Sequence, residues 1–347
     1  MEKSNLPLDT ASLQKLCYYR HGINSNETMR ISQKLYEKGF ITYMRTTSRK
    51  ITSSQFLKEM SEVIKKKFGA EFVNLPTNHV QTTDAHECIR PTSGSVSNKV
   101  NRLNDKEQRI FRTIYDSTIT SCMKPSVYTD YSIEIESSVL KRRVQNVFSE
   151  MCFSGYKAYY YNNENNSDSL LKKDKVSKII SQDPKSLVLE SLTLIEDFKT
   201  NDSLYNEASI INFMKKNNIG RPSTYSYIIN HIQKKGYVSK KNTVKGVYLN
   251  HCNIEYKVQE NKATETFSKK YVLEEKDKFS ITDKGKQIIK YMQTFFPKFV
   301  DICYTSSMEE NLDKILYQNF DYNEIVRECD EYIKDKSQHA KILKKML

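Results

Sequence analysis

Long apolar segments are missing from this sequence. No run is long enough to span a bilayer, the mean hydropathy is −0.67, and the N-terminal segment MEKSNLPLDT contains no signal-peptide core. These absences exclude a membrane-spanning protein and argue against export through a signal peptide. We therefore expect an intracellular, soluble (cytoplasmic) protein with no membrane partner.

Paired cysteine motifs are missing as well. The seven cysteines are odd in number and widely separated, and none of them forms a C-x-x-C pair. A disulfide framework needs paired cysteines in a small exported chain, and a zinc ribbon needs closely spaced pairs. We expect reduced thiols in the core, with neither disulfides nor a cysteine-bound metal.

Positive charge is what the chain has in excess. Its 347 residues carry a formal net charge of +13, and 38% hydrophobic with 28% charged residues is typical of a soluble protein with two or three cores. The charge suits a nucleic acid backbone or an anionic membrane surface. The 23 tyrosines favour nucleic acid, because aromatic rings stack on unpaired bases while lysines and arginines follow the phosphates. Binding to a membrane surface rests on net charge alone.

The first 125 residues have a helical pattern. Asp9 and Asn26 stand where helix N-caps are expected, and the second of these helices ends at Gly39. Residues 40–44 are rich in β-branched and aromatic residues and predict a short strand, and a third helix is expected from about 53 to 68. Helix, helix and strand in this order are typical of winged helix-turn-helix units.

The pattern changes to that of half-buried strands after Pro125. Tyr131, Ile133 and Ile135 alternate with polar residues, and Leu187 and Leu189 alternate again. A helical pattern returns near residue 198, where the helix end KKGYV at 234–238 repeats EKGFI at 37–41. The sequence therefore predicts a multidomain α+β protein. Its expected parts are two mostly helical, winged-helix-like domains at 1–125 and 198–347, joined by a β-rich segment at 126–197.

Three short clusters contain candidate chemistry. In the first, ITYMRTTS at 41–48, Tyr43 and Arg45 are two residues apart, so a strand would place both side chains on one face. A phenol with a pKa of about 10 attacks a phosphodiester only if its anion and the charge developing on the phosphate are stabilised, which Arg45 could do. Simple packing beside a surface charge is the alternative interpretation.

The second cluster is DAHECIRPT at 84–92. His86 and Arg90 are four residues apart within it, and Pro91 stiffens the chain after them. Both side chains can bind phosphate oxygens. A histidine and an arginine on a solvated turn would give the same pattern.

The third cluster is NIGRPSTY at 218–225. Gly220 and Pro222 shape a turn, and Ser223 or Thr224 can cap the helix that follows. Hydroxyl and amide groups at a helix N-terminus bind anions. An ordinary helix cap beside Arg221 is the alternative.

Together the three clusters resemble the signatures of the type IA DNA topoisomerases, which read approximately ITYMRTDS, AHEAIRPT and IGRPSTYA in the same order. The segments TASLQ, KLYE, EAS and YTSSME extend the resemblance from about residue 7 to about residue 320. The resemblance implies that Tyr43 is a covalent nucleophile and Arg45 its phosphate partner. The DNA contacts that it implies, on the backbone and in a single-strand groove, are His86, Arg90, Arg221, Ser223 and Thr224.

The resemblance also implies a reaction, which is reversible transesterification. Tyr43 would attack one DNA strand and keep its 5′ phosphate as a phosphotyrosine, and the freed 3′ hydroxyl would reverse the step after another strand passes. Bond energy is conserved, so ATP is not required. Binding of the single-stranded segment should weaken steeply with salt.

The sequence departs from the family pattern at its metal site. The family binds Mg²⁺ through a glutamate and an Asp-x-Asp-x-Glu cluster in an N-terminal Toprim domain, whereas this sequence begins downstream of that domain's place and has no Asp-x-Asp spacing. Thr47 stands where the family has aspartate. Rapid cleavage by the chain alone is therefore not expected. We expect a split enzyme with a separately encoded Toprim subunit; the alternative is a non-catalytic single-stranded DNA-binding module or relic.

Overall fold

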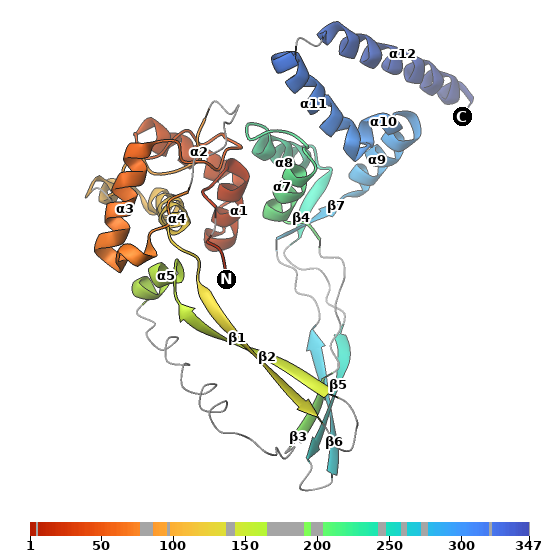
Figure 1. Ribbon diagram of the computed structural model, residues 1–347. Helices are drawn as coiled ribbons and strands as arrows, with labels where there is room; N and C mark the ends of the chain where they lie inside the picture. The colour runs from red at the N-terminus through yellow and green to blue at the C-terminus, as the bar shows by residue number, and fades with distance from the viewer. Residues whose placement is uncertain are drawn as a thin grey trace. The chain divides into compact units, whose positions relative to one another are not determined.

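The computed structural model describes residues 1–4, 6–76, 86–95, 98–136, 143–164, 191–195, 204–241, 248–257, 262–271, 277–318 and 321–346. It contains both helices and strands, which confirms the predicted α+β class (Figure 1). The expected strand around Leu187 and Leu189 and the first two residues of the second cluster lie outside the described residues. None of the helices in the described part combines the length and apolar character that crossing a membrane needs.

The chain divides into two compact units. The first comprises Met1–Asp9, Ile31–Leu194 and Ile254–Glu265, and the second comprises Thr10–Arg30, Ile195–Asn253 and Thr266–Leu347. The domain boundaries expected from the sequence, at 125/126 and 197/198, remain predictions.

The first unit is built around helices with well-defined starts. Helix α3 (Ser54–Phe68) lies where the sequence predicted a helix, and Ser53 caps it, because its hydroxyl accepts the Phe56 N–H at 3.2 Å. Asn104 and Glu107 form a reciprocal capping box at the start of α4 (Asp105–Ser121). The fully buried side chains that pack this unit include Met60, Ile64, Ile110 and Ile114.

A long antiparallel hairpin follows these helices. Strand β1 (Val127–Glu136) pairs with β2 (Arg143–Phe153) along its whole length, from Val127 opposite Phe153 to Glu136 opposite Arg143. This confirms the strand predicted from alternation after Pro125. Gly155, at a φ of 52°, then turns the chain into α5 (Lys157–Glu164).

The second unit has its core between α1 (Thr10–His21), α7 (Glu207–Lys216) and α8 (Tyr225–Lys234). Strands β4 (Val238–Lys241) and β7 (Lys278–Ile281) form an antiparallel pair beside them. The core residues are Ala11, Ile211, Met214, Tyr225, Ile229 and Phe279. The later helices are α9 (Asp283–Phe295), α10 (Pro297–Val300), α11 (Ile302–Gln318) and α12 (Tyr322–Met346).

Three further strands form a separate sheet. They are β3 (Ser191–Ile195), β5 (Tyr248–Lys257) and β6 (Lys262–Tyr271), and their order in the sheet is β3-β5-β6. Helix α2 (Ser25–Glu37) continues from residues of the second unit into the first.

Two local predictions need correction. The expected strand at 40–44 is a single bridge between Ile41 and Pro91. The Arg90 N–H donates to the Thr42 hydroxyl rather than to the Thr42 carbonyl, and the Cys88 N–H donates to the Lys50 carbonyl, so the ladder does not continue. Helix α2 is capped by Asn24 rather than Asn26, since the Asn24 Oδ1 accepts the Glu27 N–H at 2.8 Å. Either asparagine is a good cap by residue type, so composition could not choose between them.

The thiol prediction is correct for only part of the set. Cys17, Cys88 and Cys122 are free and buried, and burial raises the pKa of the Cys88 thiol to about 12. Cys152 and Cys303 are exposed, which the sequence did not reveal.

The predicted similarity between the helix ends at 37–41 and 234–238 is confirmed in their backbone geometry. Gly39 and Gly236 have φ angles of 72° and 70°. The N–H groups of Phe40 and Tyr237 each donate to the carbonyl five residues earlier, at 2.9 and 3.0 Å. Both helices therefore end in a Schellman motif, which requires a left-handed residue and hence favours glycine.

Alanine substitutions at two glycines should separate backbone strain from steric overlap. A Cβ at Gly39 would have nothing within 4 Å, whereas one at Gly155 would lie 2.3 Å from the Pro125 carbonyl oxygen. We expect Gly39→Ala to lower the free energy of unfolding by about 1–2 kcal/mol, the cost of a left-handed alanine, and Gly155→Ala to lower it further. Urea denaturation followed by circular dichroism measures both, and equal losses would contradict the steric contribution.

Candidate active site

The first and second sequence clusters lie against each other in the first unit. The Thr42 N–H donates to the Arg90 carbonyl at 2.9 Å, and the Thr92 N–H donates to the Phe40 carbonyl at 3.1 Å. These two bonds flank the bridge between Ile41 and Pro91. The backbone just before Tyr43 is therefore fixed to the segment that carries His86 and Arg90.

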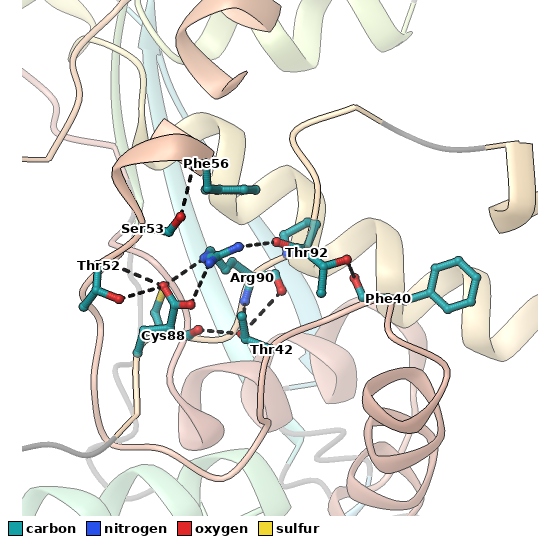
Figure 2. A network of polar contacts seen from close by, with 10 residues as sticks. Phe40, Thr42, Thr52, Ser53, Phe56, Cys88, Arg90 and Thr92 are labelled. Carbon is teal, nitrogen blue, oxygen red and sulfur yellow. Dashed lines mark hydrogen bonds and ion pairs between the residues drawn. The ribbon is translucent and has the colours of Figure 1, made fainter. Parts of the chain in front are cut away.

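Side-chain hydroxyls strengthen this attachment (Figure 2). The Thr42 hydroxyl donates to the Cys88 carbonyl at 2.7 Å and accepts the Arg90 N–H at 2.9 Å. The Thr92 hydroxyl donates to the Gly39 carbonyl at 2.8 Å. Thr42 thus uses both its donor and its acceptor on one neighbouring segment, which a valine of the same shape could not do.

Tyr43 is half-buried between two other rings. Its ring centroid lies 5.4 Å from that of Tyr36 in an edge-to-face arrangement, and 4.7 Å from that of His86. Its neighbour Met44 is fully buried and anchors the segment in the core. The structure therefore brings together two of the residues that the resemblance selected, Tyr43 and His86.

Arg45 is exposed to solvent. Within the described part of the chain it has no hydrogen-bond or ion-pair partner, so its guanidinium is available to an anion. The strand geometry that would have placed Arg45 on the face of Tyr43 is not formed. Thr47, two residues after Arg45, is also exposed.

Arg90 has a different environment from Arg45, because it is only 6% exposed. Its Nε and Nη2 atoms donate to the Glu87 carboxylate at 2.9 and 2.6 Å, and its Nη1 donates to the Pro91 carbonyl at 2.8 Å. Figure 2 shows the guanidinium beside the Phe56 ring, 4.1 Å from its centroid. Every nitrogen of the guanidinium already has a partner, so the geometry favours a positioning role over the predicted contact with the DNA backbone.

Glu87 connects this arginine to the start of α3. Its Oε2 also accepts from the Thr52 N–H and hydroxyl at 3.2 and 3.3 Å. Phe56, under Arg90, is the residue whose N–H is capped by Ser53. One ion pair therefore holds the second cluster, the loop after Tyr43 and the N-terminus of α3 in register.

The third cluster lies in the second unit and forms the turn before α8. Gly220 has a φ of 75°, and a Cβ there would lie 2.9 Å from the Thr224 Oγ1. The Thr224 hydroxyl accepts the Arg221 N–H at 2.9 Å and makes no capping bond to the helix. The predicted side-chain cap by Thr224 is therefore wrong, because the hydroxyl is used to close the turn. Ser223 is exposed.

The Arg221 guanidinium is held by α11. Its Nη2 lies 2.9 Å from the Asp313 Oδ2 and 3.4 Å from a Glu309 carboxylate oxygen. Asp313 is 54% exposed, so this pair is screened by solvent and weak. A phosphate that approached Arg221 would compete with Asp313.

The described residues do not fit a magnesium site. Among them, no three histidine, cysteine, aspartate or glutamate side chains gather closely enough to hold a metal ion. Mg²⁺ binds through oxygen ligands in an octahedral arrangement. No catalytic step is therefore assigned to a metal held by these residues.

Sequence reasoning missed three residues of this site. Tyr36 packs on the candidate nucleophile, while Glu87 and Phe56 hold Arg90. The three-residue spacing between Glu87 and Arg90 was a signal for the ion pair. Nothing local indicated Tyr36 or Phe56, because their contacts join different segments.

Known proteins resemble this chain over most of its length. A family model described as DNA topoisomerase matches residues 1–257. DNA topoisomerase 1 of Buchnera aphidicola is 26% identical over 349 residues, covering 99% of this chain and 35% of that protein. DNA topoisomerase 1 of Fervidobacterium islandicum is 29% identical over 356 residues, covering 95% of this chain and 43% of that protein.

A solved structure shares the fold. Full-length topoisomerase I from Thermotoga maritima superposes with a TM-score of 0.66 at 21% identity, covering 96% of this chain and 50% of that one. The chain thus spans about half or less of the length of these relatives. Because the DNA topoisomerase model matches about three quarters of its residues, this chain belongs to the type IA DNA topoisomerase family.

Proposed function

We propose that this chain carries the strand-cleaving part of a type IA topoisomerase, with Tyr43 as its nucleophile. The observation that carries the proposal is the placement of Tyr43. Its ring lies 4.7 Å from that of His86, on backbone that is hydrogen-bonded to the second cluster. A fixed phenol beside an exposed imidazole and an exposed arginine is suited to a reacting phosphate.

In the proposed reaction the Tyr43 Oη attacks a backbone phosphorus and loses its proton to solvent or a nearby base. The P–O3′ bond breaks as the P–O bond to tyrosine forms, and the leaving 3′ oxygen takes up a proton. The 5′ phosphate remains on Tyr43 until the 3′ hydroxyl attacks it in the reverse step. Passage of another strand before this reversal would change DNA topology.

The other residues take three kinds of role in this proposal. Arg45 and His86 contact the phosphate at the reaction centre, because both are exposed next to Tyr43 in the chain or in space. Arg90 positions their backbone from the interior. The groove for the single strand includes Arg221, Ser223 and Thr224 in the second unit.

The proposal extends to the fold and to the metal. The two helix ends that share a Schellman motif would each belong to a winged-helix-like domain, and the strands between them to a β-rich arch segment. Because the described residues do not form a magnesium site, we propose that ligands for Mg²⁺ come from elsewhere, such as a separately encoded Toprim subunit. The DNA substrate would enter as a single-stranded segment.

A second candidate function is a non-catalytic, single-stranded DNA-binding module. It is favoured by the lack of a metal-ligand cluster among the described residues and by Thr47 at the position where the family pattern has aspartate. It predicts binding without covalent chemistry. The two functions are separated by one measurement.

That measurement is adduct formation with end-labelled single-stranded DNA. With Mg²⁺ and an added Toprim fragment, we expect a denaturation-resistant adduct that Tyr43→Phe abolishes, because the phenol oxygen forms the covalent bond. Tyr36→Phe is the matched control, since Tyr36 packs on Tyr43 but should leave the adduct intact. An adduct with the chain alone would remove the need for the Toprim partner. Bound DNA without any adduct would establish the binding module instead.

Arg45 and Arg90 should differ in how they affect salt dependence. Arg45→Gln should lower the slope of log affinity against log salt by about 1, as expected for one lost phosphate contact. Arg90→Gln should leave that slope unchanged but lower the free energy of unfolding by about 3 kcal/mol, because it removes the buried cation that faces the partly buried Glu87 carboxylate. DNA titrations at several salt concentrations, with urea denaturation of each variant, measure both. A reduced slope in Arg90→Gln would restore a direct contact with DNA.

Removal of the carboxylate that faces Arg221 should strengthen DNA binding. Asp313→Asn should raise affinity at low salt by about two- to fivefold, within the range of an exposed ion pair. Glu310→Gln, which removes the same charge from α11 without any ion pair to Arg221, is the control. The gain should vanish in an Arg221→Gln background. Equal gains in both carboxylate variants would show a general charge effect and refute the specific competition.

A further inference from the structure

One face of α8 presents an exposed ring. Tyr227 and His231 are four residues apart on α8 and are both exposed, with Tyr227 at 63%, and Ser223 is exposed in the turn before the helix. Residues four apart lie on the same side of a helix. The opposite side carries Tyr225 and Ile229, which are 4% and 1% exposed and belong to the core. The helix therefore holds the exposed face rigidly on the second unit.

The exposed rings form a stacked pair. The Tyr227 and His231 rings are 5.4 Å apart between centroids and inclined by 25°. Single exposed tyrosines are common on protein surfaces and need no explanation. Here a neighbouring ring supports the tyrosine and restricts its rotamers, so its outer face is prepared to receive another planar group with little further loss of entropy.

The sequence that contains α8 carries basic residues but no acidic ones. Residues 208–254 contain no aspartate or glutamate, but they contain eight basic residues: Lys215, Lys216, Arg221, Lys234, Lys235, Lys240, Lys241 and Lys245. Lys234 and Lys235 are exposed at the C-terminal end of α8. The carboxylates that reach this region from other elements are Asp313 and Glu309 on Arg221, and Glu207 on Lys240. Neither Tyr227 nor His231 has a carboxylate partner among the described residues.

We propose that Tyr227, supported by His231, is a base-stacking platform for single-stranded nucleic acid, with Ser223 and Lys234 beside it for the backbone. A solvated ring among cations suits an unpaired base, whose π-face stacks without regard to sequence. A duplex keeps its bases inside and could use only the charges. This proposal adds a contact with the single-stranded DNA segment to the proposed function. It rests on that function only in taking the bound DNA to be the segment that is cleaved.

The absence of tryptophan from the sequence allows a direct test. Tyr227→Trp places a sole indole on the proposed platform, and stacking on a base should quench its fluorescence when unlabelled single-stranded DNA is added. Tyr322→Trp is the matched control, because Tyr322 is 60% exposed at the start of α12. We expect quenching only at position 227. Equal quenching at both positions, or none at 227 while DNA is bound, would overturn the proposal.

Affinity gives a second readout. Tyr227→Ala should weaken single-stranded DNA binding by roughly 5- to 150-fold, the range of one lost base stack, while Tyr227→Phe and Tyr322→Ala should bind as the unaltered chain does. Duplex DNA of the same sequence and anionic phospholipid vesicles are the comparison probes. A loss of binding to duplex or vesicles as large as the loss to single strands would refute stacking.

The two proposals fail separately. All binding is measured in the Tyr43→Phe background, so the result does not depend on cleavage. If no adduct forms with unsubstituted Tyr43 but DNA still quenches the fluorescence of Tyr227→Trp, only the cleavage proposal is lost. If the adduct forms, but DNA does not quench Tyr227→Trp and Tyr227→Ala binds as tightly as the unaltered chain, only the stacking platform is lost.

Discussion

The ion pair between Arg90 and Glu87 is the interaction on which the site depends. It lies over Phe56 at the start of α3 and reaches Thr52 in the loop after Tyr43. Through its backbone, Arg90 also holds Thr42. A buried guanidinium can take this position only if every donor finds an acceptor, so three chain segments must be in place together. The placement of the candidate nucleophile follows from that requirement.

Much of the architecture was predictable from local sequence. The helix start at Ser53, the strand after Pro125 and the repeated helix ends at Gly39 and Gly236 all follow from short-range rules, and all three agree with the structure. Where those rules failed, two local options were equally good, as with Asn24 and Asn26, or tertiary contacts decided. The strand expected at 40–44 is one such case, because the Arg90 and Cys88 N–H groups that would extend its pairing donate to the Thr42 hydroxyl and the Lys50 carbonyl instead.

The candidate site was predictable as a set of motifs but not as an arrangement. Resemblance brought Tyr43 and His86 to attention, and the structure places their rings together. The resemblance could not show that Arg90 is buried while Arg45 is exposed, since both are arginines in segments that match the family signatures. Burial depends on partners such as Phe56, which lies in a different segment with no motif of its own.

The burial of Arg90 has a consequence for how signature residues are interpreted in chains of this kind. Glu87, Arg90 and Thr42 are bonded to one another or to backbone inside the protein. A descendant that had lost all chemistry would still need them in order to fold. The presence of these three residues in such a chain therefore indicates only that the chain folds. Substitution of the solvent-facing Arg45 or His86 would indicate that selection no longer acts on a reaction.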